Sequence, residues 1–187
     1  MIKTFLLFDI GATKFRSEVK DINGEVLFHD SISTPQNYRL ALDNFARIAK
    51  LVGKFKPSII VIGLPGIFNK YKEKIHSFEN LKLWDMKPIA RDLQKIYGLK
   101  IKIILENDAA LAALGESESR GNKKSILAYL TISTGVGGAR IVNGMIDSSS
   151  VGFEPGKQVL FYDKGVTITL EEYVSGNGIK ARYMREA

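Results

Sequence analysis

The sequence predicts an α/β fold built from two related halves. Short apolar runs typical of buried strands alternate with amphipathic stretches typical of helices. One arrangement occurs twice, namely an apolar strand, a glycine turn, a second strand and an Asn-Gly hairpin. It reads FLLFDIGATKFRSEVKDINGEV near the start of the chain and ILAYLTISTGVGGARIVNGMI from residue 126. Such an internal repeat indicates duplication, so we expect one domain over residues 1–120 and the start of a second over 121–187.

The elements of the first half follow from local patterns. Residues 5–10 form an apolar run that predicts a central strand. The next two predicted strands, TKFRSEVKD and EVLFHDSIS, are joined by ING, in which Asn23-Gly24 is a strong two-residue hairpin signal. Further buried strands are predicted over residues 58–66, which end in a Gly- and Pro-containing turn, and over 101–105.

Three helices are predicted between and after these strands. Apolar side chains recur at spacings of three and four over residues 38–55 and again over 85–97. Gly98 follows the second of these segments, as glycine commonly follows a helix. A third helix is expected over residues 109–119, and either Asn107 or Asp108 can cap it.

The second half begins after a polar segment, residues 117–125. A strand, a glycine turn and another strand follow, and Asn143-Gly144 gives a second hairpin signal. A helix start is predicted at Thr169. Glu171 and Glu172 then fall in its first turn, where acidic side chains interact favourably with the helix dipole.

Composition excludes several classes of protein. The chain has 187 residues, of which 45% are hydrophobic and 25% charged, as in an ordinary globular protein. It contains no cysteine, which excludes disulfides and thiolate metal sites. No apolar run approaches the roughly 20 residues of a membrane span, and the first apolar run contains an Asp, unlike a signal peptide. We therefore expect a cytoplasmic protein that binds no membrane.

The net charge of +7 raises the question of nucleic-acid binding. The Lys and Arg residues are scattered, however, and no zinc finger, helix-turn-helix or RNA-binding aromatic motif is present. We expect a solvated basic surface that mildly favours anionic substrates, and no nucleic-acid partner.

Two glycine turns are candidate phosphate sites, DIGATK (9–14) and STGVGGA (133–139). Glycine lets the backbone approach a ligand closely, and consecutive N–H groups can hold an anion. Four side chains of the turns add hydroxyl or ammonium donors: Thr13, Lys14, Ser133 and Thr134. Neither turn matches the GxxxxGK[ST] phosphate loop. Either turn alone is more often a plain hairpin, but two in a duplicated frame favour a phosphate site.

Several acidic residues lie where ligands commonly bind. Asp9 ends the first strand directly before a glycine turn, where a carboxylate could hold Mg²⁺. Asp108 also follows a strand, and its position suits either a ligand site or a helix cap. Glu154 lies in a Gly- and Pro-rich loop of the kind that often carries function. His29 and His76 lie away from both turns, so a base that activates a hydroxyl is expected to be a carboxylate.

Seven motifs in this order resemble the ROK family and the related bacterial glucokinases: DIGATK, GLPG, NLKLW, ENDAALAALGE, STGVGGA, GFEPGK and LEEYVSGNGI. The resemblance runs through nearly the whole chain. It implies an actin-like (ribonuclease H-like) fold with duplicated domains, the second of which is incomplete here. It also implies an enzyme that uses ATP and Mg²⁺ to phosphorylate a hexose hydroxyl.

The resemblance also implies roles for single residues. Asp108 would be the catalytic base that accepts the proton of the sugar hydroxyl, and Asp9 would help to place Mg²⁺ through water. The sugar would be bound by Gly66, Asn107, Asp108, Glu154 and Glu171. The phosphates would be surrounded by Gly11, Thr13, Lys14, Thr134, Gly135 and Gly137.

Two positions depart from the family pattern. Ala12 stands where the family usually has a second glycine. Lys157 stands where the family has a histidine that binds sugar or zinc. Because cysteine is also absent, we expect no structural zinc. A lysine can still donate to a sugar hydroxyl, so we count Lys157 among the sugar-binding residues and allow for a changed substrate preference.

The length of the chain leaves two functional hypotheses open. Members of the family continue beyond residue 187 with an adenosine-binding motif and most of the second domain. We therefore expect either a truncated or split sugar kinase, or a non-catalytic sugar-binding or regulatory module derived from one. A transcriptional repressor is disfavoured, because no helix-turn-helix precedes DIGATK. An incomplete second half would expose apolar surface, so we expect a homodimer or a poorly stable chain.

Overall fold

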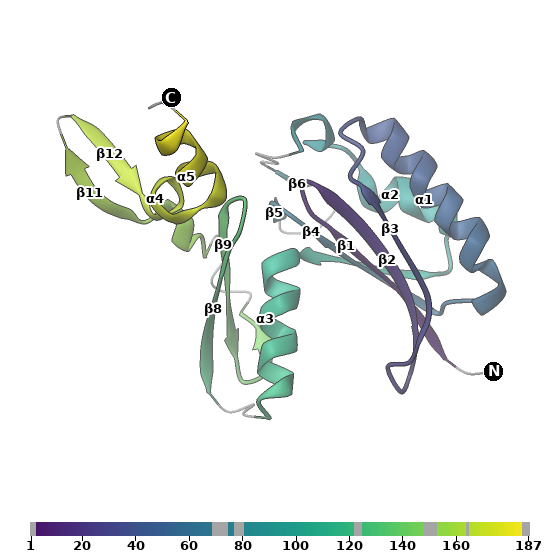
Figure 1. Ribbon diagram of the computed structural model, residues 1–187. Coiled ribbons are helices and arrows are strands. Elements are labelled where there is room, and N and C mark those ends of the chain that lie inside the picture. The colour runs from purple at the N-terminus through teal and green to yellow at the C-terminus, as the bar shows by residue number, and fades with distance from the viewer. Residues whose placement is uncertain are drawn as a thin grey trace. The chain divides into compact units, whose positions relative to one another are not determined.

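A computed structural model describes residues 3–68, 75–76, 81–121, 125–147, 153–163 and 165–184. The predicted α/β class is confirmed, with strands and helices alternating along the chain (Figure 1). The chain divides into two compact units, Met1–Asp108 and Ala109–Ala187. These units are defined by their compactness and not by duplication, so the boundary between duplicated domains near residue 120 stays a prediction.

A five-stranded mixed sheet forms the centre of the first unit, in the order β3-β2-β1-β4-β7. Strands β1, β4 and β7 are parallel, whereas β1, β2 and β3 form an antiparallel meander. The strands are β1 Thr4–Ile10, β2 Lys14–Asp21, β3 Val26–Ser33, β4 Ile59–Leu64 and β7 Lys102–Asn107. A short separate ribbon joins β5 Ile67–Phe68 to β6 Ile75–His76.

Helices α1 (Tyr38–Val52) and α2 (Ile89–Tyr97) pack together on one face of this sheet (Figure 1). A 3₁₀ turn, Gly53–Phe55, extends α1 as far as the sequence predicts, and another, Lys82–Trp84, precedes α2. The start of α2 was predicted four residues too early. Pro88 disfavours helical backbone at the residue before it, so the helix begins only at Ile89.

Alternation along β1 gives the sheet two different faces. Leu6, Phe8 and Ile10 are buried against the helices, where Phe8 makes edge-to-face contacts with aromatic rings of the core. The intervening side chains lie on the opposite, open face and are partly or fully exposed. Asp9 is therefore directed away from the helices, because successive strand residues point to opposite faces.

The sheet of the second unit has three strands in the order β10-β9-β8: β8 Ile126–Ile132, β9 Val136–Val142 and β10 Met145–Ile146. Helix α3 (Asp108–Ser119) covers one face of it. Ala110 and Ala113 pack there against Ala139 and Ile141. The small side chains of α3 let the helix approach the strands closely, which explains its alanine-rich sequence.

The remaining elements are a 3₁₀ turn Pro155–Lys157, strands β11 Val159–Asp163 and β12 Val166–Thr169, and helices α4 Leu170–Val174 and α5 Gly176–Tyr183. Thr169 and Glu172 form a capping box at the start of α4. Hydrogen bonds from the backbone N–H and the hydroxyl of Thr169 hold the pKa of the Glu172 carboxyl below its ordinary value. The helix predicted to start at Thr169 is thus confirmed. No helix in the described ranges is long and apolar enough to cross a membrane.

The packing of α1 predicts a clear contrast between two neighbouring positions. Ile48 is fully buried in the core, whereas Leu51, on the same helix, is 46% exposed. We expect Ile48→Ala to lower the free energy of unfolding by about 2–5 kcal/mol and Leu51→Ala by less than about 0.5 kcal/mol. Urea denaturation followed by circular dichroism measures both values. Equal losses would contradict the assigned face of α1.

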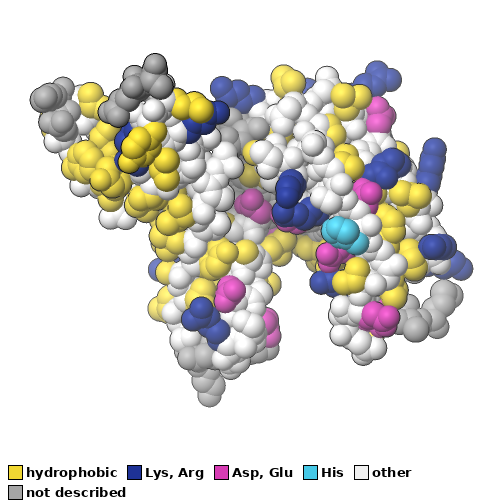
Figure 2. Space-filling model, in the orientation of Figure 1, with side chains coloured by type: hydrophobic (Ala, Val, Ile, Leu, Met, Phe, Trp, Pro, Cys, Tyr) yellow, Lys and Arg dark blue, Asp and Glu magenta, His cyan; other side chains and the backbone are white. Residues whose placement is uncertain are grey.

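The second unit exposes much apolar surface. Figure 2 shows hydrophobic side chains gathered over the β11–β12 hairpin, and Val159, Tyr162 and Val166 are each more than half exposed. Patches of this kind mark association surfaces or aggregation-prone sites. We expect sedimentation coefficients to rise with protein concentration, and the Tyr162→Lys, Val166→Lys double variant to reduce the rise. A wild-type chain that remains monomeric at all concentrations would contradict this expectation.

Candidate functional site

The carboxyl edge of the parallel strands gathers the first group of predicted site residues. Asp9 of β1 is the register partner of Gly63 of β4, which is in turn the partner of Glu106 of β7. On the other side, Asp9 pairs with Arg16 of β2. Register partners share a face of the sheet, so Arg16, Asp9, Gly63 and Glu106 form one row across four strands on the open face. Ligands commonly bind beyond this edge in open α/β sheets.

Asp9 is held by a cross-strand ion pair. Its Oδ2 atom lies 2.6 Å from Nη1 of Arg16, and the two side chains are 58% and 46% exposed, respectively. Among the described residues, Arg16 is the polar partner of this carboxylate. The aspartate predicted to place a metal therefore has a protein cation beside it.

The first glycine turn is fixed through its carbonyl groups. Thr34 donates from Oγ1 to the Gly11 carbonyl at 2.7 Å and from its backbone N–H to the Thr13 carbonyl at 3.0 Å. Gln36 donates to the Ala12 carbonyl at 3.1 Å. By contrast, no hydrogen bond within the described chain involves the N–H of Ala12 or Thr13. Three tethered carbonyls beside two available amides suit the binding of an anion.

Gly66 and Asn107 come together at the end of β7. The Asn107 side chain donates from Nδ2 to the Gly66 carbonyl at 3.1 Å. Gly66 has a φ of 114°, a backbone conformation that residues other than glycine rarely adopt. Asp108 follows as the first residue of α3, and Glu106 accepts the Asn107 N–H at 3.1 Å. The loop after β4 is thus tied to the end of β7, directly before the predicted base.

The second glycine turn rests on the start of helix α5. The carbonyl of Ser133 accepts the Gly176 N–H at 2.7 Å, and the carbonyl of Thr134 accepts the Asn177 N–H at 3.2 Å. These N–H groups belong to the first turn of the helix, where backbone donors lack partners inside the helix. Ser175, fully buried, caps the same helix by accepting the Gly178 N–H. The turn and α5 therefore complete one another's hydrogen bonding.

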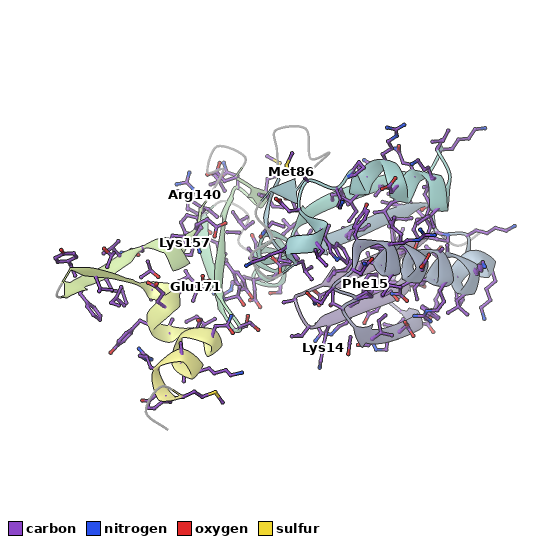
Figure 3. The ribbon with its side chains drawn as sticks, turned by 90° about the horizontal axis from the view of Figure 1, so that it is seen from above. Lys14, Phe15, Met86, Arg140, Lys157 and Glu171 are labelled. Atoms are coloured by element: carbon purple, nitrogen blue, oxygen red, sulfur yellow. The ribbon has the colours of Figure 1, made fainter. Side chains whose placement is uncertain are left out.

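Glu171 connects this turn to the loop that contains Lys157. Its Oε2 atom accepts the Val136 N–H at 2.7 Å, and its Oε1 atom lies 3.3 Å from Nζ of Lys157 (Figure 3). A Cβ atom added to Gly135 would come within 2.6 Å of Oε2. Glycine at position 135 is thus what lets the carboxylate approach the turn.

The loop before Lys157 packs directly on strand β9. A Cβ atom added to Gly156 would lie 2.5 Å from the Val136 carbonyl oxygen, and one added to Gly138 would lie 2.6 Å from Cγ of Pro155. Glu154 precedes this contact, and its carbonyl accepts the Lys157 N–H at 3.0 Å. Glycine at positions 156 and 138 therefore allows residues 155–156 to pack closely on β9.

The predicted site residues fall into two groups, one in each unit. The first unit holds Asp9, Gly11, Thr13, Lys14, Gly66, Asn107 and Asp108. The second holds Thr134, Gly135, Gly137, Glu154, Lys157 and Glu171. Their roles stay predictions. His29 is an exposed residue of β3 beside Glu18, as expected, whereas the side chain of His76 lies outside the described residues.

Sequence reasoning missed Arg16 and Glu106. Arg16 could have been found from the hairpin: a two-residue loop after Gly11 pairs residue 9 with residue 16. Glu106 required the parallel register between β4 and β7, which no local pattern gives. In the part of the chain that the structure describes, no group of three or more His, Cys, Asp or Glu residues could hold a metal.

Comparisons with known proteins give a family and several named relatives. The model of the ROK family matches residues 6–187. The N-acetyl-D-glucosamine kinase of Mannheimia succiniciproducens is 30% identical over 198 residues, which cover 94% of this chain and 64% of that protein. A glucokinase of Streptomyces coelicolor is 28% identical over 74% of this chain and 43% of its own length. The chain thus spans less than two thirds of the curated relatives it matches.

Solved structures show the same fold. A ROK family protein from Streptococcus pneumoniae, in complex with sucrose, has a TM-score of 0.79 at 24% identity and matches 98% of this chain and 62% of its own. A ROK family glucokinase from Streptomyces griseus, in complex with glucose and AMPPNP, has a TM-score of 0.78 at 22% identity, over 100% of this chain and 61% of its own. The actin-like fold predicted from the sequence is confirmed.

The contact between Gly156 and strand β9 predicts a position-specific cost. Gly156→Ala should lower the free energy of unfolding by about 1–3 kcal/mol, because the new methyl group would overlap the Val136 carbonyl oxygen. Gly115 lies in α3, and a Cβ atom there would meet nothing within 4 Å. Gly115→Ala should therefore stabilise by about 0.5–1 kcal/mol. Urea denaturation distinguishes the two. Equal effects would show that Gly156 is not closely packed.

Proposed function

Because the chain belongs to the ROK family, we propose that it phosphorylates a hydroxyl group of a hexose at the expense of ATP. The observation that carries the proposal is the carboxyl edge of the first sheet. There a strand-end carboxylate, Asp9, precedes a glycine turn with available amides. Asn107 ends a parallel strand of the same sheet, and Asp108 follows it as the first residue of α3. The relatives named as N-acetyl-D-glucosamine kinases and glucokinases support it.

Asp108 would serve as the base. Phosphoryl transfer requires alignment and charge stabilisation more than covalent chemistry, and a carboxylate at the acceptor hydroxyl removes the proton as the new bond forms. Asp108 starts α3 directly after β7, so its backbone is fixed by two regular elements. Asn107, tied to Gly66, would hold the sugar beside it. Well-supported side chains of this kind position a substrate precisely.

Glu154, Lys157 and Glu171 would bind further hydroxyls of the sugar. Glu171 already accepts from Val136 and Lys157, but an ionised carboxylate offers about four lone-pair positions. It can therefore still accept from a sugar hydroxyl. Lys157 can donate to a sugar oxygen while it remains near Glu171. A buried polar partner left without its hydroxyl costs roughly 1–3 kcal/mol, which would let these side chains discriminate between sugars.

The nucleotide phosphates would be bound by the two glycine turns, through Gly11, Thr13, Lys14, Thr134, Gly135 and Gly137. Lys14 extends from the first turn as an exposed cation (Figure 3). The donor set at Asp9 fits a hydrated Mg²⁺, because a single half-exposed carboxylate leaves most positions of that ion to water. When bound, Mg²⁺ would neutralise charge on the phosphate oxygens.

The alternative is a non-catalytic sugar-binding or regulatory module derived from a kinase. The observation that favours it is the Asp9–Arg16 ion pair, since it engages the carboxylate that would serve the metal. The two functions differ in turnover and not in sugar binding.

Removing the Asp108 carboxylate separates the two functions. We expect Asp108→Asn to lower the rate of sugar-dependent ADP release by about 10²–10⁴-fold, because an amide cannot act as a base. The assay uses the chain with ATP, Mg²⁺ and a panel of glucose, N-acetylglucosamine and N-acetylmannosamine. Sugar binding, measured by calorimetry, should be retained.

The matched control is Asp43→Asn, which makes the same change at an exposed position of α1. It should leave both ADP release and sugar binding unchanged. Sugar binding by the wild-type chain without any ADP release would overturn the kinase proposal and support the binding module.

A further inference from the structure

Arg16 was not among the residues expected to act at the first glycine turn, yet the structure places it beside that turn. It lies directly opposite Asp9 in the antiparallel pair of β1 and β2, at the base of the first glycine turn. We propose that Arg16 is a second cation of this site that exchanges partners: it neutralises Asp9 until a divalent cation binds there, and it then contacts the phosphate group. This inference rests on the proposed function, because it assumes that the turn binds phosphate.

The faces of β2 place two cations beside the turn. Phe15 is buried against the helices, so Lys14 and Arg16, on either side of it, share the open face with Asp9. Arg16 is therefore two residues from the turn and on the same side of the sheet as the carboxylate. A guanidinium has a planar set of donors that matches phosphate as well as carboxylate, so one side chain can serve both partners.

Arg16 and a divalent cation compete for Asp9. The guanidinium lies 2.6 Å from Oδ2, and its positive charge opposes the approach of another cation. The competition is readily reversed, since both side chains are about half exposed and ion pairs of this kind contribute little to stability. Once the pair opens, the guanidinium is left without its carboxylate, beside a turn whose Ala12 and Thr13 amides have no acceptor in the described chain.

A plain surface ion pair would behave differently. Lys20 and Glu18 form such a pair on the same face of β2, at 3.2 Å, farther from the glycine turn along the strand. If Arg16 were only another pair of this kind, removing its charge would have the same small effect as removing that of Lys20. The two positions therefore provide a matched comparison.

The experiment measures two ligands separately on the chain: Mn²⁺ alone, by the spin-resonance signal of the free ion, and inorganic tripolyphosphate without metal, by calorimetry. Arg16→Met removes the charge and keeps an apolar stem. We expect this variant to bind Mn²⁺ about two- to fivefold more tightly, because one half-exposed competitor for Asp9 is lost. We expect it to bind tripolyphosphate at least about fivefold more weakly. Lys20→Met should change neither affinity by more than about twofold.

Opposite shifts for the two ligands carry the inference, because a folding defect would weaken both. Asp9→Asn should weaken Mn²⁺ binding and abolish the gain given by Arg16→Met, which assigns the metal signal to Asp9. Parallel losses, or an Arg16→Met variant that resembles Lys20→Met, would overturn the inference. A chain that shows the opposite shifts in Mn²⁺ and tripolyphosphate affinity but releases no ADP in the presence of sugar would contradict the proposed function alone.

Discussion

The register of the parallel strands β1, β4 and β7 is the constraint on which the first unit depends. It aligns Leu6, Ile60 and Ile103 on one face, where α1 and α2 cover the core. The same register aligns Asp9, Gly63 and Glu106 on the other face. A shift of one residue in any strand would send its polar end into the core and its apolar side chains into water. Burial of the core thus fixes the positions of the charged side chains.

In the second unit, close backbone contacts fix the positions of the predicted site residues. Its sheet is small, and the loop 153–158 is held by close backbone contacts rather than by a large core. Gly156 and Gly138 let that loop meet β9, and Glu171 joins the loop to the glycine turn through Lys157 and the Val136 amide. The two loop contacts depend on the absence of a side chain at Gly156 and at Gly138. Glycine here is a packing requirement as much as a source of backbone freedom.

The sequence predicted the strands of the two larger sheets, the two Asn-Gly hairpins and the start of α4, because each depends on residues that are close along the chain. It did not predict β5, β6, β11 and β12. The hairpin at Asn143-Gly144 illustrates this. Both residues have positive φ, 52° and 74°, which asparagine and glycine adopt more readily than other residues. The start of α2 was misplaced because hydrophobic spacing outweighed the effect of Pro88. The partners of Asp9 and Glu171 were not foreseen, because ion pairs depend on strand register and on loops that meet in space.

The two glycine turns, both predicted to bind phosphate, differ in their hydrogen bonding. In the second turn, the Val136 amide is already hydrogen-bonded to Glu171, and the Ser133 and Thr134 carbonyls accept from α5. In the first turn, the carbonyls are tied to Thr34 and Gln36 and no carboxylate engages the amides of the described chain. In the described chain, N–H groups without an acceptor occur at both turns, those of Ala12 and Thr13 at the first and those of Thr134 and Gly135 at the second. At the second turn, however, the Glu171 carboxylate on the Val136 amide would repel an anion.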